Sequence, residues 1–272
     1  MRPFLKWPGN KYRIVNYIKA KLPNGNRLIE PFVGSGSVFL NTNYNEYLLA
    51  DNNEDLINLY ITLQKEGENF ISFCRSFFIP DNNTKEKYYY YRRLFNITKD
   101  PRLKSALLIY LNRHGYNGLV RYNKNGVYNV PFGKYKRPYF PEAEMHYFWY
   151  KSQKAIFIRG DFKDIMAKTC RGDVIYCDPP YVPLSNTSNF TNYSTGGFTL
   201  KHQHELTKLA LKLSNQDIPV LISNHDTKLT RLIYKNADIT RIKVQRYISC
   251  NGAKRTKVNE ILAFFKGKGS GF

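Results

Sequence analysis

Cysteine and histidine are scarce in this sequence, and their spacing argues against two kinds of site. The chain has 4 cysteines and 5 histidines among 272 residues. They include no C-x-x-C pair and no metal-ligand pattern, and His202 and His204, two residues apart, would lie on different faces of a helix. We therefore expect no metal and no disulfide, with reduced thiols at Cys74, Cys170, Cys177 and Cys250.

The thiol of Cys177 adjoins Asp178, which raises the alternative of a nucleophilic cysteine. A thiol within an apolar run is usually packed and unreactive, because burial disfavours the thiolate. We interpret Cys177 as a core residue.

Long apolar runs are also missing. No stretch reaches the length of a membrane span, and the first residues lack the apolar region of a signal peptide. The chain is nevertheless 42% hydrophobic, which over 272 residues is enough to bury a full α/β core and carry an inserted subdomain. We expect a soluble protein of the cytoplasm.

Acidic residues are few. The chain has 21 Asp and Glu against 42 Lys and Arg, a formal net charge of +21. Such an excess is typical of a protein with a polyanionic partner. The alternative is a general compositional bias toward Lys, Asn, Ile and Tyr, so the charge agrees with a nucleic-acid partner without proving one.

The segment Asp178-Pro179-Pro180-Tyr181 follows the apolar run Asp173–Cys177. Two prolines stiffen the backbone here and prevent the strand from continuing. The Asp178 carboxylate and the Pro179 carbonyl could accept both N–H groups of an exocyclic amine on a base, which would draw the nitrogen toward tetrahedral geometry. The Tyr181 ring could stack on a base extruded from a duplex. The alternative is a proline-stiffened strand end with a buried tyrosine.

A glycine-containing loop lies upstream, where Arg27–Ile29 is predicted as a short buried strand and Glu30–Ser37 follows it. Gly34 and Gly36 permit a tight turn and close approach of the backbone to a ligand. The third glycine of the dinucleotide-binding motif is absent, because Phe39 occupies its position. The alternative is an ordinary turn.

A second predicted strand, Tyr47–Asp51, ends in an acid about 20 residues beyond Glu30, a spacing at which a carboxylate can bind ribose hydroxyls. Together with the loop, this favours a cofactor that carries a nucleoside but no pyrophosphate. S-adenosylmethionine fits that description.

Strand and helix signals alternate as in a parallel sheet. Helical spacing of Leu206, Leu209, Ala210 and Leu213 predicts a helix that crosses over between two strands. Ligands bind at the carboxyl ends of such strands, where Phe32–Gly36, Asp51, Asp161 and Asp178 fall. The predicted strands are 27–29, 47–51, 155–159, 174–177 and 220–224.

Residues 53–149 interrupt this alternation. Helical patterns cover 55–77, 85–95 and 103–113, and the polar, aromatic stretch 114–128 contains Asn125-Gly126, a strong hairpin signal. Such a hairpin could enter a major groove, and the alternative is a solvated hairpin with an aromatic underside. Its basic and aromatic side chains are Arg121, Lys124, Lys134, Lys136 and Arg137, and Tyr116, Tyr122, Tyr128 and Tyr135.

Six segments, in sequence order, are FLKWPGNK at 4–11, EPFVGSG at 30–36, NRHGYNGLVRYN at 112–123, NVPFG at 129–133, DPPY at 178–181 and SNHD at 223–226. They resemble the Dam-type DNA adenine methyltransferases, and their order is that of the family's alpha group. The resemblance implies an α/β, Rossmann-like sheet that binds S-adenosylmethionine. It also implies a catalytic domain of residues 1–52 and 150–272, and an inserted, mainly helical target-recognition domain of residues 53–149 that carries the hairpin.

The resemblance implies roles at matching positions. Asp178, Pro179, Pro180 and Tyr181 would hold a flipped adenine of duplex DNA, and the target would be GATC. S-adenosylmethionine would lie against Trp7, Lys11, Phe32, Gly34, Ser35, Gly36, Asp51, Asp161, Phe162 and Asp178. The DNA would be contacted by Lys6, Arg92, Tyr116, Asn117, Leu119, Arg121, Asn123, Pro131 and Tyr135, and its phosphates also by residues 254–257.

One segment departs from the family pattern, since Pro8-Gly9-Asn10 stands where many members have Ala-Gly-Gly. Asn can adopt positive φ, so we expect cofactor binding to be retained. Two rival interpretations stay open: a methyltransferase of RNA bases or protein glutamine, which commonly has Asn in place of Asp178, and a DNA-binding protein without activity. The expected oligomeric state is a monomer.

Overall fold

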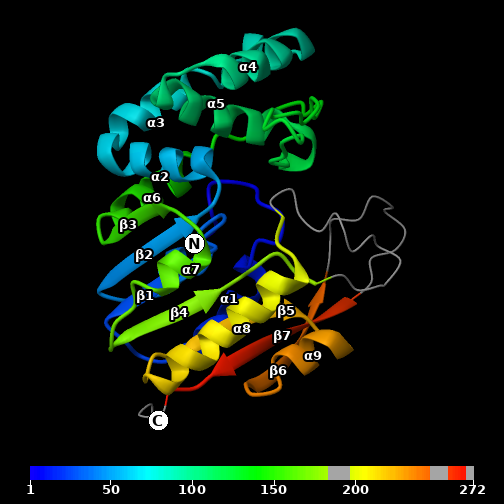
Figure 1. Ribbon diagram of the computed structural model, residues 1–272. Coiled ribbons are helices and arrows are strands. Elements are labelled where there is room, and N and C mark those ends of the chain that lie inside the picture. Colours follow the sequence, from blue (N-terminus) through cyan, green and yellow to red (C-terminus); the bar gives the residue numbers. More distant parts are fainter. Residues whose placement is uncertain (183–196, 246–256, 268–272) are drawn as a thin grey trace. The chain divides into compact units, whose positions relative to one another are not determined.

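The computed structural model describes residues 1–182, 197–245 and 257–267, and Figure 1 shows its helices and strands. A seven-stranded mixed sheet has the order β3-β2-β1-β4-β5-β7-β6, which confirms the predicted α/β class. The strands are β1 (Arg27–Glu30), β2 (Glu46–Asp51), β3 (Ala155–Arg159), β4 (Asp173–Cys177), β5 (Val220–His225), β6 (Asp238–Gln245) and β7 (Lys257–Phe265).

The chain divides into two compact units. Unit 1 comprises Met1–Arg13, Val33–Thr42 and Asp51–Arg159, and unit 2 comprises Ile14–Phe32, Asn43–Ala50 and Gly160–Phe272. This division follows contacts within the chain, whereas the division at residues 52 and 150 concerns function and stays a prediction. No helix in the described part of the chain is long and apolar enough to cross a membrane.

Unit 2 contains a parallel core in which β1 pairs with β4 and β4 with β5. All five residues of β4 are buried, as expected for a parallel strand covered on both faces. The predicted crossover helix forms as α8 (Leu200–Asn215), which packs on β5 and β7 (Figure 1). The other helices of this unit are α1 (Val15–Lys21), α7 (Phe162–Met166) and α9 (Lys228–Ile233).

The expectation of a parallel arrangement fails at the end of the chain, where β7 runs antiparallel to both β5 and β6. Neither β6 nor β7 was among the predicted strands. An antiparallel pair needs no crossover helix, so the alternation of strand and helix used to predict the parallel part gives no signal for β6 and β7.

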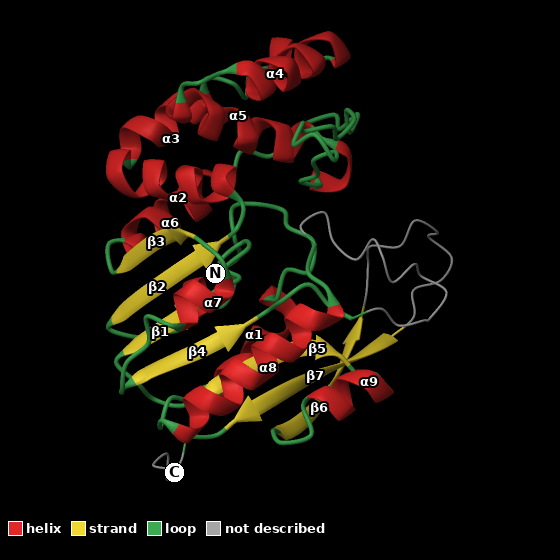
Figure 2. Ribbon diagram, in the orientation of Figure 1, coloured by secondary structure: helices red, strands yellow, loops and turns green. Residues whose placement is uncertain are grey.

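The helices of unit 1 pack around α5, which contacts α2, α3 and α4 (Figure 2). The predicted single helix over 55–77 is two helices, because Gly67 breaks it with a φ of 52°. A Cβ at Gly67 would overlap the Trp149 ring, so the break is also fixed by packing. The helices are α2 (Glu54–Glu66), α3 (Glu68–Arg75), α4 (Lys85–Ile97), α5 (Pro101–His114) and α6 (Glu142–Ser152).

The short 3₁₀ helices are η1 (Tyr12–Ile14), η2 (Phe39–Asn41), η3 (Pro80–Asn82) and η4 (Tyr116–Gly118).

The predicted hairpin reverses direction where expected, but it forms no named strands. The Gly126 N–H donates to the Asn123 carbonyl at 3.0 Å, and Gly126 has a φ of 73°. Beyond this turn, Tyr122 and Tyr128 form one isolated bridge. Both backbone groups of Tyr128 bond the Asn96 side chain, at 2.9 and 3.1 Å.

Candidate active site and DNA-recognition residues

The glycine loop of unit 1 is held closely by two aromatic side chains. Gly34 and Gly36 have φ values of 47° and 72°, which favour glycine. A Cβ at Gly34 would stand 3.0 Å from the indole nitrogen of Trp7, and the Tyr60 hydroxyl donates to the Gly34 carbonyl at 2.6 Å. The loop therefore presents bare backbone beside a tryptophan ring, as a loop that binds a nucleoside cofactor requires.

Asp51, at the end of β2, is tied to the same loop. Its carboxylate accepts the N–H of Gly34 at 3.1 Å and that of Asn53 at 2.9 Å. Burial raises the pKa of Asp51, and these backbone hydrogen bonds oppose that shift. Asn52 is a third backbone donor to this carboxylate. Since a carboxylate offers about four lone-pair sites, capacity for a ribose hydroxyl is left. The Asp51 carboxylate thus fits the ribose of a nucleoside.

Asn10, the departure from the family pattern, does not adopt positive φ; Gly9 has that conformation, with a φ of 76°. The Asn10 side chain instead bonds the glycine loop. Its Nδ2 donates to the Ser35 hydroxyl at 3.0 Å, and its Oδ1 accepts from the Ser37 hydroxyl at 2.9 Å. The adjacent Lys11 is buried, and its Nζ donates to the Gly9 carbonyl at 2.6 Å.

Three phenylalanine rings gather in unit 2. The ring centroids of Phe32 and Phe162 are 5.6 Å apart in a stacked arrangement, and Phe198 lies 5.6 Å from each. Asp161 caps the N-terminus of α7 by accepting the N–H of Lys163 at 3.0 Å. Phe198, which precedes α8, was not predicted from the sequence, where it lies far from the other two rings.

The segment Asp178–Tyr181 leaves the end of β4 and is held through its side chains and backbone. The Ser223 hydroxyl donates to the Asp178 carboxylate at 2.8 Å, and the Gln203 side-chain amide donates to the Pro180 carbonyl at 2.8 Å. The Tyr181 hydroxyl donates to the Glu260 carboxylate at 2.9 Å.

Ionisation in this region is shifted by burial. Burial raises the pKa of Tyr181 well above its ordinary value, and the charges of Asp178 and Glu260 add to the shift. Tyr181 therefore stays neutral and able to donate. Burial also raises the pKa of Cys177, which is fully buried, and this agrees with a packed thiol rather than a nucleophile.

Several residues assigned to DNA come together in unit 1. The Lys6 ammonium lies 4.6 Å from the centroid of the Tyr135 ring, and the Tyr135 hydroxyl accepts the N–H of Asn117 at 3.0 Å. Asn117 has a positive φ of 54°. Burial lowers the pKa of Lys6, and the charge of Arg113 lowers it further.

Asn112 connects this cluster and was given no role by sequence analysis. Its side chain, fully buried on α5, accepts the N–H of Lys6 at 2.9 Å and donates to the carbonyls of Lys6 and Gly118 at 2.8 Å each. A buried polar residue in an apolar helical pattern was the signal that could have identified it.

Arg121 is presented by its neighbours in the turn. Its Nε donates to the Asn129 side chain at 2.7 Å, and one Nη donates to the Asn129 carbonyl at 3.3 Å. The next residue, Tyr122, donates its hydroxyl to Asp55 at 2.7 Å, and Asp55 also pairs with Lys104 at 2.9 Å. The exposed Arg121 side chain thus directly precedes a tyrosine whose hydroxyl bonds α2.

Comparison with known proteins decides the family. Residues 7–248 match the family described as D12 class N6 adenine-specific DNA methyltransferase. The chain belongs to this family. It is 51% identical over 265 residues to the DNA adenine methylase of Escherichia coli K12, with 97% of this chain and 95% of the relative covered. The DNA adenine methylases of Serratia marcescens (50% identity, 97% and 98% covered) and Vibrio cholerae O395 (51%, 97% and 96%) are comparably similar.

This adenine-specific DNA methyltransferase belongs to the enzymes that use S-adenosylmethionine. The roles of single residues stay predictions. Unit 1 brings together Trp7, Gly34 and Asp51, and separately Lys6, Asn117 and Tyr135; unit 2 brings together Phe32 and Phe162.

The other residues assigned to the methyltransferase's DNA contacts are distributed along the same stretch of unit 1. Tyr116 is 52% exposed and its N–H donates to the Pro131 carbonyl at 2.8 Å. The Leu119 carbonyl accepts from Tyr128 at 3.0 Å, and the Asn123 side chain caps the turn. Arg92 donates to the Val130 carbonyl at 2.9 Å, a contact within the protein that the sequence did not indicate.

Two expectations fall on residues outside the described ranges, namely Cys250 and the basic residues at 254–256. Among the residues that the structure describes, no group of three or more His, Cys, Asp or Glu side chains is arranged to hold a metal ion.

Proposed function

We propose that this methyltransferase modifies N6 of a flipped adenine within GATC in duplex DNA. The observation that carries the proposal is the segment Asp178–Tyr181, in which an acid held at a strand end lies three residues before a tyrosine fixed by its hydroxyl. Such an arrangement suits a planar amine that must be gripped at its edge and stacked on its face.

The roles of this segment follow from its chemistry. The Asp178 carboxylate and the Pro179 carbonyl accept the two N–H groups of the adenine amine, so its lone pair becomes available. Tyr181 stacks on the base, and Pro180 keeps the backbone stiff. S-adenosylmethionine, when bound, would supply the methyl group for N6.

We assign the cofactor to two sets of residues on the basis of the family motifs and the local contacts of each unit. In unit 1 the set is Trp7, Lys11, Gly34, Ser35, Gly36 and Asp51, where Asp51 receives a ribose hydroxyl. In unit 2 the set is Phe32, Asp161, Phe162 and Asp178.

Sequence reading is assigned to the stretch around Arg121, whose guanidinium would bond guanine O6 and N7. Arg121 uses two of its N–H groups, one on Nε and one on an Nη, to bond Asn129. The N–H groups that remain on the two Nη atoms are available for such a bidentate contact. Lys6, Tyr116, Asn117, Leu119, Asn123, Pro131 and Tyr135 read or wedge into the site. Arg92 and residues 254–257 position the phosphates.

A monomer suffices for this reaction. An enzyme that methylates duplex DNA acts where that DNA is, so we propose a cytoplasmic protein associated with the nucleoid.

The test is transfer of labelled methyl groups to three substrates: a GATC duplex, a duplex of the same composition with the site scrambled, and a structured RNA. Label on the GATC duplex alone, resident on adenine N6 after digestion, is the expected result. Equal label on both duplexes contradicts the GATC assignment. Label on RNA alone, or on none of the three, favours one of the rival interpretations instead.

A further inference from the structure

Strand β5 is longer than its neighbour at the end where the reacting segment begins. In the parallel register Cys177 pairs with Ile222, and β4 ends there, but β5 continues through Ser223, Asn224 and His225. These three residues keep antiparallel pairing with β7, so their backbone is held on that side. Ser223, Asn224 and His225 lie beside residues 178–182, which follow β4.

Each of the three residues bonds the segment 178–182. The Ser223 hydroxyl donates to the Asp178 carboxylate at 2.8 Å, and the Val182 N–H donates to the Asn224 side chain at 3.1 Å. The His225 Nδ1 lies 2.6 Å from the Val182 carbonyl, which can only accept, so this nitrogen carries the proton. All three side chains are buried.

The hydrogen bond to Asp178 continues into the core. The Tyr176 hydroxyl lies 3.0 Å from the Ser223 oxygen. The Ser223 hydroxyl has one proton, which it donates to the Asp178 carboxylate. In the bond between Tyr176 and Ser223, the Tyr176 hydroxyl is therefore the donor. Burial raises the pKa of Tyr176 and keeps that donor protonated. Two hydroxyl groups in series thus orient the carboxylate in a buried environment, where each bond strengthens the other.

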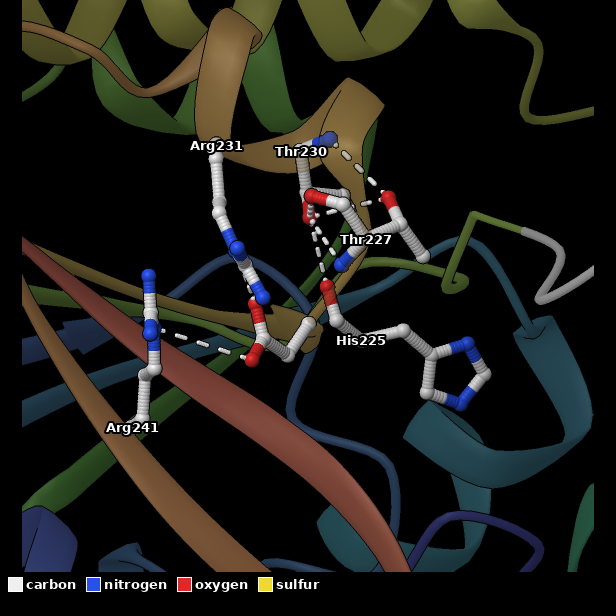
Figure 3. Close-up of polar contacts among 6 residues, drawn as sticks. His225, Thr227, Thr230, Arg231 and Arg241 are labelled. Carbon is white, nitrogen blue, oxygen red and sulfur yellow. Dashed lines mark hydrogen bonds and ion pairs between the residues drawn. The ribbon is translucent and has the colours of Figure 1, made fainter.

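The end of β5 is itself fixed. The Asp226 carboxylate, which follows His225, forms ion pairs with two arginines, Arg231 and Arg241, both labelled in Figure 3. Its side chain is 2% exposed, and it bonds Arg231 on α9 at 2.6 Å and pairs with Arg241 on β6 at 3.8 Å. The hydroxyl of Thr230 donates to the His225 carbonyl at 2.6 Å, also drawn in Figure 3.

We propose that Ser223, Asn224 and His225 are positioning residues that set the geometry of Asp178–Val182 before DNA binds. The motif Ser223–Asp226 resembles the family in sequence, and the proposal assigns a role to its residues. The inference rests on the proposed role of Asp178 as an acceptor for the adenine amine. Ser223 acts by orienting the Asp178 carboxylate, so we expect its loss to slow the chemical step more than it weakens the binding of either substrate.

The test is Ser223→Ala, compared with Ser214→Ala as a matched control. Ser214 is also a buried serine of unit 2, but its hydroxyl donates to the Leu211 carbonyl within α8. We expect Ser223→Ala to lower the single-turnover methylation rate about 10- to 100-fold, the range for losing a hydrogen bond to a charged group. The dissociation constants for cofactor and GATC duplex should stay within about threefold of the control, as fits a bond that acts mainly on the chemical step. A rate equal to that of the control overturns the proposal, as does a loss carried wholly by weaker binding.

Tyr176→Phe provides a second measurement if Ser223→Ala does not fold. It deletes only the hydroxyl that donates to Ser223 and keeps the buried ring. We expect the single-turnover rate to fall about 3- to 10-fold, because a bond between neutral groups is weaker. A parental rate in this variant contradicts the proposed chain of hydroxyl groups.

Asp178→Ala in the same assay distinguishes failure of the proposed role of Asp178 from failure of the positioning role of Ser223. If it still methylates the duplex at near parental rate, the proposed function of Asp178 is wrong. If it is inactive while Ser223→Ala and Tyr176→Phe are as fast as Ser214→Ala, only the positioning role is wrong.

Discussion

The reacting segment of unit 2 and the DNA-reading stretch of unit 1 differ in where their hydrogen bonds lead. Residues 178–182 bond to buried side chains of β5, β7 and α8. In the reading stretch, Arg121 bonds to Asn129 and Tyr135 bonds to Asn117, all within residues 116–137. Other residues of that stretch bond side chains of the helices, among them Asn112, Asp55, Tyr88, Arg92 and Asn96.

The difference corresponds to two tasks. A group that stabilises a reaction works best when its orientation is fixed in advance, because reorganisation then costs little. A surface that reads bases must exchange protein partners for DNA, and exposed side chains do this at lower cost than buried ones. Substitutions in the first region should therefore affect the rate, and those in the second the choice of sequence.

The largest effect is expected at Asp178. Asp178→Ala should lower the methylation rate of a GATC duplex by at least about 100-fold, because an acceptor of the amine is lost at the reacting atom. Asp164→Ala, which removes an exposed acid of α7, is the control and should retain parental rate. Near-parental activity of Asp178→Ala would remove the basis for calling this region the reaction centre.

Acidification should lower the free energy of unfolding of unit 1 through His114. Burial lowers the pKa of this imidazole from 6.5 to about 4, because its ring stacks on Tyr110 in the helical core of unit 1. Only the unfolded state takes up the proton between these values. The free energy of unfolding therefore falls as the pH is lowered from 6.5 to about 4, by about 3 kcal/mol in total.

Hydrogen exchange read by region between pH 7 and pH 4 would measure this loss, and we expect it in α5 first. His114→Phe should abolish this contribution, whereas replacing exposed His204 by Asn should leave it unchanged. Equal acid sensitivity of the parent and His114→Phe would contradict the assignment.

Arg121 should govern sequence choice. Arg121→Ala is expected to reduce discrimination against a wrong base at one guanine by about 1 to 3 kcal/mol, or roughly 5- to 150-fold, with rates on each single-substituted duplex as the measurement. Lys124→Ala, in the same exposed turn, is the matched control. A uniform loss of affinity for all duplexes would instead identify Arg121 as a phosphate contact.

The smallest effect is expected at Tyr122, which anchors the turn. Tyr122→Phe removes its hydrogen bond to Asp55, which keeps Lys104 as a partner. We expect a loss of about 1 kcal/mol in the free energy of unfolding and a change in discrimination of less than about threefold. Tyr150→Phe, at a residue 79% exposed, provides the reference in the same denaturation experiment. A change in discrimination as large as that of Arg121→Ala would show that the bond between Tyr122 and Asp55 determines the geometry of the turn.

The sequence was sufficient to predict the parallel part of the sheet, since the predicted strands 27–29, 174–177 and 220–224 lie within β1, β4 and β5. It did not predict the break at Gly67, because the ring that requires it belongs to Trp149, far along the chain. The same applies to Asn112, which bonds Lys6 across 106 residues. Periodicity reports which face of an element is apolar, but it does not report which distant segment supplies a hydrogen-bond partner.

The length of β5 has a consequence for how much variation the sheet tolerates. Side chains alternate between the two faces of a strand, so the removal of one residue from β5 would carry Ser223 to the opposite face and bring Asn224 beside Asp178. Loops between the strands can vary in length without this result. The number of residues in one buried strand thus determines which side chain meets the reacting carboxylate, and the sheet register becomes a constraint on catalysis as well as on folding.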